Sequence, residues 1–351
     1  MPKTPFDGAR GQMRQTGYTR ASTLGPIAEV VGATGGSIER VFRRAELPLG
    51  LLESPDTLLP LRDHFRLLAA SSRELADEAF AARLGRRTSI AGLGVYGKWV
   101  TLAPTLLEAI HRAGTSLPHM LQSATRLVLR RQSEEVVWSY ELDDPATEGR
   151  PQNEMLAVWY MIALVRHFAG ARWLPRRVMF GGLPASARRS IGEQMGADIV
   201  LCDGPGSIVF DQRLLMTVNP RLGEGDGLDA EEIARIFDIP APDDLPGKIG
   251  VLIELELLGG RPTLETVVRR AGLSKRTLQR RLGDLGLSYA DLLRDTLQRR
   301  AIRLLRRSDL SITEIAARLG YSDPAHFTRA FEQWSGLAPS RWRELARTAD
   351  R

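Results

Sequence analysis

The chain has few of the features that mark several common classes of protein. It contains one cysteine, Cys202, in 351 residues, which excludes an intramolecular disulfide framework. No apolar run approaches the roughly 18 residues that a membrane-spanning helix requires, and no apolar segment follows the charges at the N-terminus as in a signal peptide. These absences predict a cytoplasmic protein without a membrane partner, in which Cys202 is a small apolar residue.

Candidate metal ligands and catalytic groups are equally sparse. No serine lies in a G-x-S-x-G elbow, and the lone cysteine supports no Cys–His pair. The acidic pairs Glu134–Glu135 and Asp143–Asp144 fall in turns, where carboxylates are more often solvated than catalytic. The histidines of the first 220 residues lack the spacing of zinc ligands: His64, His111, His119 and His167. We therefore predict no catalytic residue, no metal site and no cofactor.

One glycine motif matches a cofactor fingerprint. Residues 92–97 read G-L-G-V-Y-G and satisfy G-x-G-x-x-G. That pattern indicates dinucleotide binding only when it follows a strand within a βαβ unit and precedes an acid about 20 residues on. Here R-R-T-S (86–89) precedes it and no buried strand pattern is visible, so we favour a structural role over nucleotide binding.

Positive charge is concentrated at one end of the chain. The whole chain carries a formal charge of +6, but residues 261–351 hold 19 Lys and Arg against 10 Asp and Glu, a net of +9. Residues 1–260 hold the remaining 29 against 32, a net of −3. This asymmetry is typical of a nucleic-acid-binding module joined to a neutral domain. The alternative is that the arginine-rich helices are merely solvated.

The last 91 residues contain two unequal copies of one pattern. In each, an apolar helix ends in glycine and a second helix starts at serine. The four segments are residues 264–272, 274–282, 312–320 and 322–331. With one extra residue allowed after Ser322, Leu278 and Arg280 of the first copy align with Phe327 and Arg329 of the second. Two helix-turn-helix units with basic second helices are suited to two successive major-groove faces of DNA.

A single helix is predicted to join the two units, at residues 289–307. Its apolar face comprises Leu293, Leu297, Ala301, Leu304 and Leu305. Its 19 residues span roughly 28 Å at about 1.5 Å each, close to the roughly 34 Å between successive major-groove faces. The helix would therefore hold the two second helices about one DNA turn apart.

Local start and stop signals agree with this assignment. Ser288 with Asp291 and Ser311 with Glu314 are capping pairs, and Asp323-Pro324 supplies an N-cap and a proline at the first helical position. Gly272 and Gly320 stand where each first helix must turn.

Residues 248–345 resemble the DNA-binding domain of AraC/XylS-type bacterial transcription regulators. The segment 319–343, L-G-Y-S-D-P-A-H-F-T-R-A-F-E-Q-W-S-G-L-A-P-S-R-W-R, is similar to that family's long signature. The resemblance implies an all-α domain at 248–347, with helix-turn-helix units at about 249–284 and 308–343. It also implies that two recognition helices enter adjacent major grooves of double-stranded DNA.

The resemblance assigns roles by position. Base edges are expected to meet Arg276, Gln279 and Arg280 from the first recognition helix, and Ala325, His326, Thr328 and Arg329 from the second. Phosphates are expected to meet Ser274, Lys275, Arg281, Ser322 and Arg341. The core is expected to contain Leu278, Leu282, Phe327, Phe331, Trp334, Leu337 and Trp342. Arg can pair with guanine and Gln with adenine, whereas the small Ala325 is a weak base reader. Ordinary surface roles for Arg281 and Arg341, and packing or capping for His326, remain alternatives.

The N-terminal region mixes helices with clustered strands, which predicts an α+β domain at 20–220. Helices are expected at 38–47, 61–75, 106–113 and 153–168, and strands at 126–131, 136–142, 177–180, 199–202 and 207–210. Residues 1–19 are predicted to be disordered. The Gly-, Pro- and Asp-rich residues 221–247 are predicted to be a linker, interrupted by one short helix at 229–237.

Residues 22–220 also resemble, more loosely, the arabinose-binding-type effector domain of one branch of these regulators. The resemblance rests on residues 51–61, 79–87 and 92–110. It implies a small organic effector and a homodimer surface, with the effector residues unassigned. Aromatic residues that either line a pocket or simply form core are Trp99, Trp138, Tyr140, Trp159 and Tyr160.

These observations predict a sequence-specific transcriptional regulator that is not an enzyme. By resemblance, activation is its commoner role and RNA polymerase is a partner. The effector is expected to act by changing the arrangement of residues 217–247. Two alternatives are an enzyme that its C-terminal region localises on DNA, and a non-specific DNA-binding protein without preference for a site.

Overall fold

The computed structural model describes residues 17–349, apart from 145, 184–185, 224–227 and 229–237. Contacts divide the chain at Ile239–Pro240 into two compact units, which we call the N-terminal unit and the C-terminal unit. The helix predicted at 229–237 lies outside the described residues. Within the described part of the chain, no helix has both the length and the apolar character needed to cross a bilayer.

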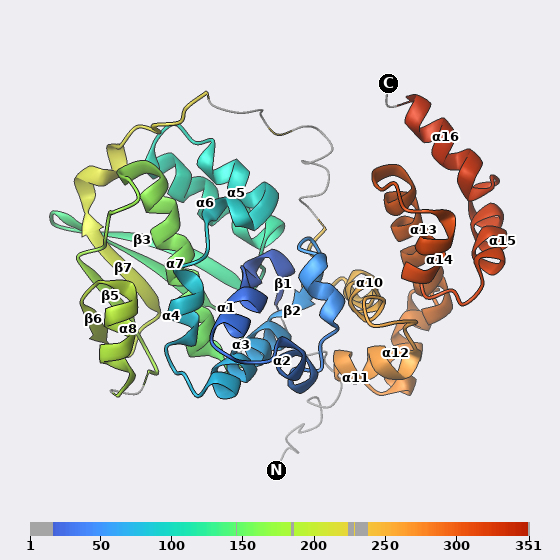
Figure 1. The fold of residues 1–351 in the computed structure, drawn as a ribbon, viewed down its shortest axis with the longest axis horizontal. Coiled ribbons are helices and arrows are strands. Elements are labelled where there is room, and N and C mark those ends of the chain that lie inside the picture. Colours follow the sequence, from blue (N-terminus) through green and yellow to red (C-terminus); the bar gives the residue numbers. More distant parts are fainter. Residues whose placement is uncertain (1–16, 145, 184–185, 224–227, 229–237, 350–351) are drawn as a thin grey trace, which may run out of the picture. The chain divides into compact units, whose positions relative to one another are not determined.

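A five-stranded sheet with strand order β3-β4-β7-β5-β6 organises the N-terminal unit. Its strands are β3 (Thr125–Gln132), β4 (Glu135–Leu142), β5 (Arg177–Phe180), β6 (Ile199–Leu201) and β7 (Gly206–Asp211). All neighbouring pairs are antiparallel except β5 and β6. The five strands predicted from period-2 patterns are confirmed to within one residue at each end. β7, the last of the five in sequence, lies at the centre of the sheet (Figure 1).

The helices of this unit pack around α7 (Arg150–Ala169). The others are α1 (Ile27–Ala33), α2 (Ile38–Arg44), α3 (Leu61–Leu75), α4 (Phe80–Gly85), α5 (Gly94–Thr101), α6 (Leu106–Met120) and α8 (Ala187–Met195). Short 3-10 turns are η1 (Ala21–Leu24), η2 (Leu49–Glu53), η3 (Ile90–Leu93) and η4 (Gln212–Met216). α7 packs against β4, β5 and β7 and also against α3 and α4 (Figure 1). Contact on several sides explains why its sequence is apolar nearly all round.

The start of the unit differs from the sequence prediction. β1 (Tyr18–Arg20) pairs antiparallel with β2 (Leu58–Pro60), two strands too short to give a pattern. Tyr18 and Thr19 are buried, so the prediction of disorder up to residue 19 is wrong at its end. The backbone N–H of Gly17 donates to Asp144 Oδ2 at 2.9 Å. Asp144, which we expected to be solvated, is therefore a buried anchor for this strand.

The glycine motif at 92–97 has the structural context of packing. It spans η3 and the start of α5, and the element before η3 is the helix α4 and not a strand. A Cβ on Gly97 would lie 1.9 Å from the carbonyl oxygen of Ile90, whereas a Cβ on Gly92 would meet only Ser89 Oγ, at 3.5 Å. Gly97 is thus required for close approach of two backbone segments, which agrees with the structural role favoured above.

The C-terminal unit is all-helical in its described residues, as predicted. Its helices are α10 (Leu245–Glu256), α11 (Leu264–Ala271), α12 (Lys275–Asp284), α13 (Tyr289–Arg307), α14 (Ile312–Arg318), α15 (Pro324–Ser335) and α16 (Pro339–Ala349). The all-α domain was predicted to begin at Lys248, but α10 begins three residues earlier. Asp244 Oδ1 accepts from the N–H of Gly247 at 2.8 Å and caps the helix there. The predicted bounds of α13 are confirmed.

The local signals that delimit these helices are also confirmed. Reciprocal capping boxes join Ser288 to Asp291 and Ser311 to Glu314, and the side chain of Asp323 accepts from the N–H of Ala325 at the start of α15. The left-handed backbone predicted where each first helix turns occurs at Gly272 (φ 68°) and Gly320 (φ 77°).

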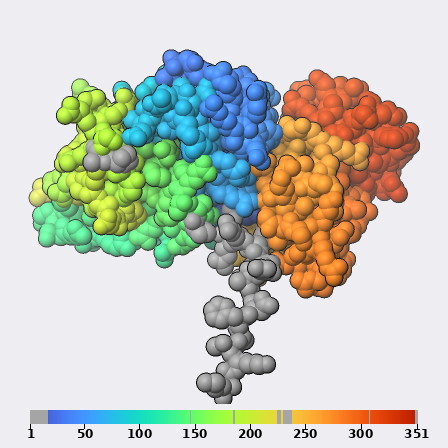
Figure 2. Space-filling model, turned by 90° about the horizontal axis from the view of Figure 1, so that it is seen from below, coloured from blue at the N-terminus to red at the C-terminus, as the bar shows by residue number. Residues whose placement is uncertain are grey.

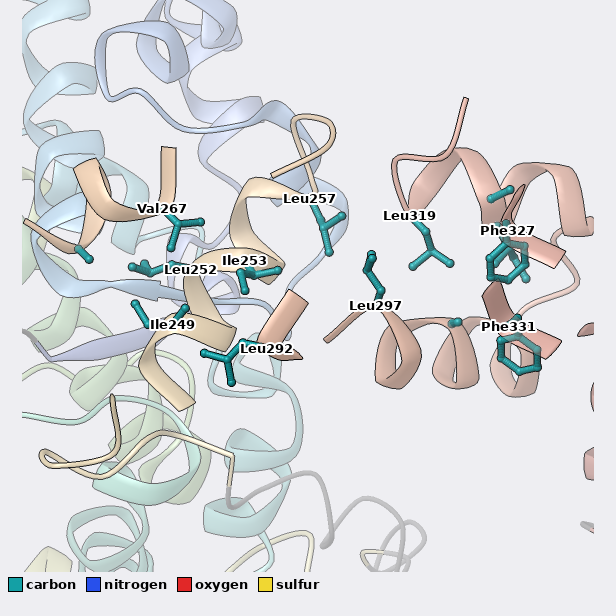
Figure 3. Close-up of a cluster of buried hydrophobic side chains, with 14 of the residues drawn as sticks. Ile249, Leu252, Ile253, Leu257, Val267, Leu292, Leu297, Leu319, Phe327 and Phe331 are labelled. Carbon is teal, nitrogen blue, oxygen red and sulfur yellow. The ribbon is translucent and has the colours of Figure 1, made fainter. Parts of the chain in front are cut away.

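One apolar core runs along α13 and joins both helix-turn-helix units. Leu292 lies beside Ile249 and Ile253 of α10, and Leu297 lies between this group and Leu319 (Figure 3). Phe327 and Phe331 fill the core of the second helix-turn-helix unit. In the space-filling view the first helix-turn-helix unit (orange) and the second helix-turn-helix unit (red) form adjoining lobes (Figure 2).

The predicted core of the C-terminal unit needs one correction. Leu278, Leu282, Phe327 and Phe331 are fully buried, and Trp334 and Trp342 are partly buried beside Phe331. Leu337, in contrast, is 37% exposed. It follows Gly336, whose left-handed backbone (φ 73°) ends α15, and therefore lies in the turn before α16.

The packing role of Gly97 can be tested by substitution. Gly97→Ala forces its methyl group against the Ile90 backbone, so we expect a loss of about 1–3 kcal/mol in the free energy of unfolding. Gly92→Ala, which changes the same motif without a collision, should stay within about 0.5 kcal/mol. Urea unfolding of both variants measures the difference. Equal stability of the two variants would contradict the packing role.

Candidate nucleic-acid interface and ligand cavity

α12 presents a polar face opposite its buried one. Leu278 and Leu282, one turn apart, are fully buried, whereas Arg276, Gln279 and Arg280 are exposed together at i, i+3 and i+4. Among the described residues, neither arginine forms an ion pair. Both guanidinium groups are therefore available to an external partner.

α15 repeats this arrangement with a different composition. Its buried face is aromatic, Phe327 and Phe331, and its exposed face carries Ala325, His326 and Arg329. Thr328 is only half-buried, and its hydroxyl donates to the Pro324 carbonyl oxygen at 3.0 Å. Its Oγ1 is therefore left mainly as an acceptor. Within the described part of the chain, Arg329 has no ion-pair partner.

The residues expected to contact phosphate differ in their present partners. Ser274 caps α12 by accepting from the N–H of Thr277 at 3.1 Å. Lys275 pairs with Glu265, and Arg341 pairs with Glu344 at 2.5 Å, in both cases between exposed side chains that DNA phosphates can displace. Arg281 is half-buried and Ser322 is exposed.

Charges on the connecting helix are partly neutralised within the unit, which the sequence did not reveal. Arg303 of α13 pairs with Glu254 of α10 at 2.6 Å, and Arg300 Nη1 donates to the Glu254 carbonyl oxygen at 3.4 Å. Arg270 of α11 also pairs with α10, through Glu256 at 2.7 Å. The two partners of each pair are between 14 and 49 residues apart in sequence, so local patterns carried no signal for them. Part of the charge of +9 therefore serves structure.

The N-terminal unit contains a cavity of about 60 Å³. We call it the cavity; its lining residues come from η1, α3, η3, α5, α6, β3, β4 and α7 and the turn after α6. The aliphatic lining residues are Ile90, Leu93, Ala113, Leu117, Leu121, Leu127, Leu156, Ala157, Met161 and Leu164. The remaining lining residues are Thr23, His64, Tyr96, Gln122, Trp138, Tyr140, Asn153 and Tyr160. A mainly apolar lining with a few polar groups is typical of a small-molecule site.

Three of the five aromatic candidates line the cavity, namely Trp138, Tyr140 and Tyr160. Trp159 instead packs on α4, where a Cβ on Gly85 would collide with its side chain, and Trp99 lies beneath the guanidinium of Arg112, 4.4 Å from the ring centroid. Sequence spacing could not tell the cavity-lining aromatic residues from those that pack elsewhere, because that depends on which face of each helix or strand meets the cavity.

A hydrogen-bonded cluster fixes the polar side of the cavity. Asn153 Nδ2 donates to the Tyr140 hydroxyl oxygen at 2.9 Å, and Gln122 Nε2 donates to the same oxygen. Gln122 Nε2 also lies 2.8 Å from Thr125 Oγ1. Burial raises the pKa of Tyr140 to about 12, so its phenol is neutral.

Among the described residues, His64 is the one histidine that lines the cavity, and sequence spacing did not indicate this position. Thr23 Oγ1 donates to the Arg20 carbonyl oxygen at 2.7 Å, and it lies 3.2 Å from His64 Nε2. Since the threonine hydroxyl has one hydrogen, it must accept from Nε2, and Nδ1 is then the unprotonated nitrogen. Burial lowers the pKa of His64 to about 4, against the opposing effect of Asn153. The imidazole is therefore neutral near pH 7.

No group of three His, Cys, Asp or Glu side chains among the described residues could hold a metal ion. Cys202 follows β6 and is partly exposed.

Comparison with known proteins identifies both units. The family described as the arabinose-binding domain of AraC transcription regulators matches residues 35–218, and a helix-turn-helix domain family matches residues 267–345. The ornithine utilization regulator of Pseudomonas aeruginosa is 26% identical over 91% of this chain and 94% of its own length. The HTH-type transcriptional regulator VirS of Mycobacterium tuberculosis is 24% identical over 92% of this chain and 96% of its own length.

Two solved structures are among those similar to this chain. The transcriptional regulator CdpR from Pseudomonas aeruginosa is 22% identical, covering 75% of this chain and 86% of its own, with a TM-score of 0.36. The DNA-binding domain of AdpA, solved in complex with a target DNA, is 28% identical over 30% of this chain and 94% of its own, with a TM-score of 0.27.

Fold, exposed recognition helices and family matches together define a DNA-binding transcriptional regulator with a separate effector-type domain. The chain belongs to the AraC family of transcription regulators. Because this family consists of regulators, the alternative of a DNA-localised enzyme is not supported.

The neutral state of His64 predicts a pH-dependent stability. The unfolded chain binds a proton near pH 6.5, whereas the folded chain resists it down to a pKa of about 4. The stabilising contribution is therefore complete above pH 6.5 and is lost as the pH falls toward 4. Between pH 7 and pH 5, the native protein should lose about 2 kcal/mol more unfolding free energy than His64→Gln. Urea unfolding at both pH values tests this, and parallel losses in the two proteins would refute it.

Proposed function

We propose that this regulator activates transcription by placing α12 and α15 in adjacent major grooves of a specific operator. Arg276, Gln279 and Arg280 are the base-reading candidates of the first helix, and His326, Thr328 and Arg329 those of the second, with Ala325 limited to apolar contact. Ser274, Lys275, Arg281, Ser322 and Arg341 are the phosphate candidates. We further propose RNA polymerase as a partner, a homodimer as the assembled form, and the cytoplasm as the location.

One observation carries the proposal. Each recognition helix buries an apolar face completely and exposes arginine on the other, and Arg276, Arg280 and Arg329 form no ion pair among the described residues. An arginine whose charge is unpaired is suited to bidentate pairing with guanine O6 and N7. A merely solvated helix would have no need for the same arrangement on both members of a tandem pair.

The connecting helix supports simultaneous contact by both helices. α13 has 19 residues, a length of roughly 28 Å, and the core around it is shared by both units. Recognition helices fixed to one rod at this separation suit one face of a duplex, where major grooves recur roughly every 34 Å.

We propose that a small organic effector in the cavity controls this binding through the connection between the units. Arg20 is buried on the wall of the N-terminal unit, where Nε donates to the Met120 carbonyl oxygen at 2.6 Å and Nη1 to that of Asp56 at 2.8 Å. The same guanidinium forms an ion pair with Asp238, at the end of this unit. Its carbonyl oxygen accepts from Thr23, which lines the cavity. Contacts through Thr23, Arg20 and Asp238 therefore link the cavity to the end of the N-terminal unit. An effector acts by favouring one arrangement of these contacts over another.

Base reading by Arg280 is tested with its neighbour as control. Arg280→Ala should weaken binding to the selected operator by about 1–3 kcal/mol and relax the preference at one base pair. Arg281→Ala should instead weaken binding to all sequences alike and reduce the salt slope by about one. Selection of bound genomic fragments followed by gel-shift titration against operator and random duplex measures both effects.

The same titration separates this proposal from non-specific DNA binding. A regulator should prefer its operator by roughly 10³-fold or more over random duplex. Equal affinity for both duplexes would overturn site-specific recognition, and an unchanged sequence preference in Arg280→Ala would remove that residue from the base-reading set.

A further inference from the structure

The lining of the cavity restricts what it can hold. None of the described residues that line it is Asp, Glu, Lys or Arg, and most of them are aliphatic. A carboxylate or ammonium group placed there would lose its hydration without gaining a charged partner, which is strongly unfavourable. Because the neutral His64 and Tyr140 add no charge near pH 7, the lining also provides no counter-ion by titration.

Two buried polar atoms in the lining have no partner within the described residues. Trp138 and His64 are each only 1% exposed, and neither Trp138 Nε1 nor His64 Nδ1 makes a hydrogen bond. Most buried polar atoms in proteins are hydrogen-bonded, and an unpaired one carries a desolvation cost. Trp138 Nε1 is a donor only, and the tautomer set by Thr23 leaves His64 Nδ1 as an acceptor.

The Tyr140 hydroxyl group also lines the cavity and has a hydrogen that it can donate. Its oxygen accepts from both Gln122 and Asn153, so these amides fix its position. Trp138 and Tyr140 are two residues apart on β4, and their side chains therefore stand on the same face of the sheet. The polar atoms of the lining thus occur beside an otherwise apolar wall.

We propose that the effector is an uncharged, mainly apolar small molecule with one carbonyl or hydroxyl group, which accepts a hydrogen bond from Trp138. This inference rests on the proposed effector role of the cavity and names the class of compound. Sugars, with many hydroxyl groups to satisfy, and charged metabolites such as amino acids or carboxylates are disfavoured by the same lining.

Three probes of similar size and different polarity test the class, using the full chain and calorimetric titration. Acetophenone has a carbonyl group, ethylbenzene has none, and benzoate is an anion. We expect acetophenone to bind at least about tenfold more tightly than benzoate. Binding of benzoate as tight as that of acetophenone would overturn the proposal.

Two tryptophan variants test the hydrogen bond. Trp138→Phe keeps the aromatic wall and removes the N–H, so acetophenone should bind about five- to tenfold more weakly while ethylbenzene is unaffected. Trp159→Phe is the matched control, because Trp159 is also buried with an unpaired Nε1 but does not line the cavity. Equal effects of both variants, or none from Trp138→Phe, would contradict the assignment. If Trp138→Phe does not fold, Leu117→Phe, which fills the cavity from α6, should reduce binding of both neutral probes.

Operator binding distinguishes this inference from the proposed function. Acetophenone that binds the cavity and changes operator affinity supports both. Binding without any change in operator affinity would overturn the effector role of the cavity and, with it, the proposed class of effector. The proposal of DNA recognition would be unaffected. A charged effector that competes with acetophenone overturns the ligand class alone.

Discussion

The buried strip of α13 is the constraint on which the C-terminal unit depends. Leu292, Leu297, Ala301 and Leu305 recur at helical spacing and are each buried in a core that reaches both helix-turn-helix units. Helix α10 of the first unit and helices α14, α15 and α16 of the second all pack against α13. The separation and orientation of α12 and α15 are consequently a property of one hydrophobic core and do not depend on a flexible joint.

Sequence was most informative where structure is decided locally. The capping boxes at Ser288 and Ser311, the turns at Gly272 and Gly320 and the bounds of α13 all follow from residues within one or two turns of each other. The same holds for the five strands, whose bounds lie within one residue of those predicted. The exposed face of α12 could be predicted from sequence because Leu278 and Leu282, on the opposite buried face, are spaced one helical turn apart.

Features that depend on distant segments were missed for a common physical reason. β1 and β2 are three residues each and are separated by 37 positions, so neither produces a period. Asp144 was expected in water because only the fold brings Gly17 to it. The cavity is similar: His64 and Trp138 are ordinary core residues by sequence, and their unpaired nitrogens exist only because α3 and β4 bound the same space. Leu337 was assigned to the core by signature, yet the turn after Gly336 leaves it partly in solvent.

The place of β7 in the sheet has a consequence for how the N-terminal unit is made. The β3–β4 hairpin and the residues of β5 and β6 leave the ribosome first, yet β4 and β5 are joined only through β7. Until residues 206–211 emerge, both strands keep an open edge able to pair with another chain. A chain that ends at about residue 205 would therefore have two pairs of strands with no hydrogen-bonded strand between them.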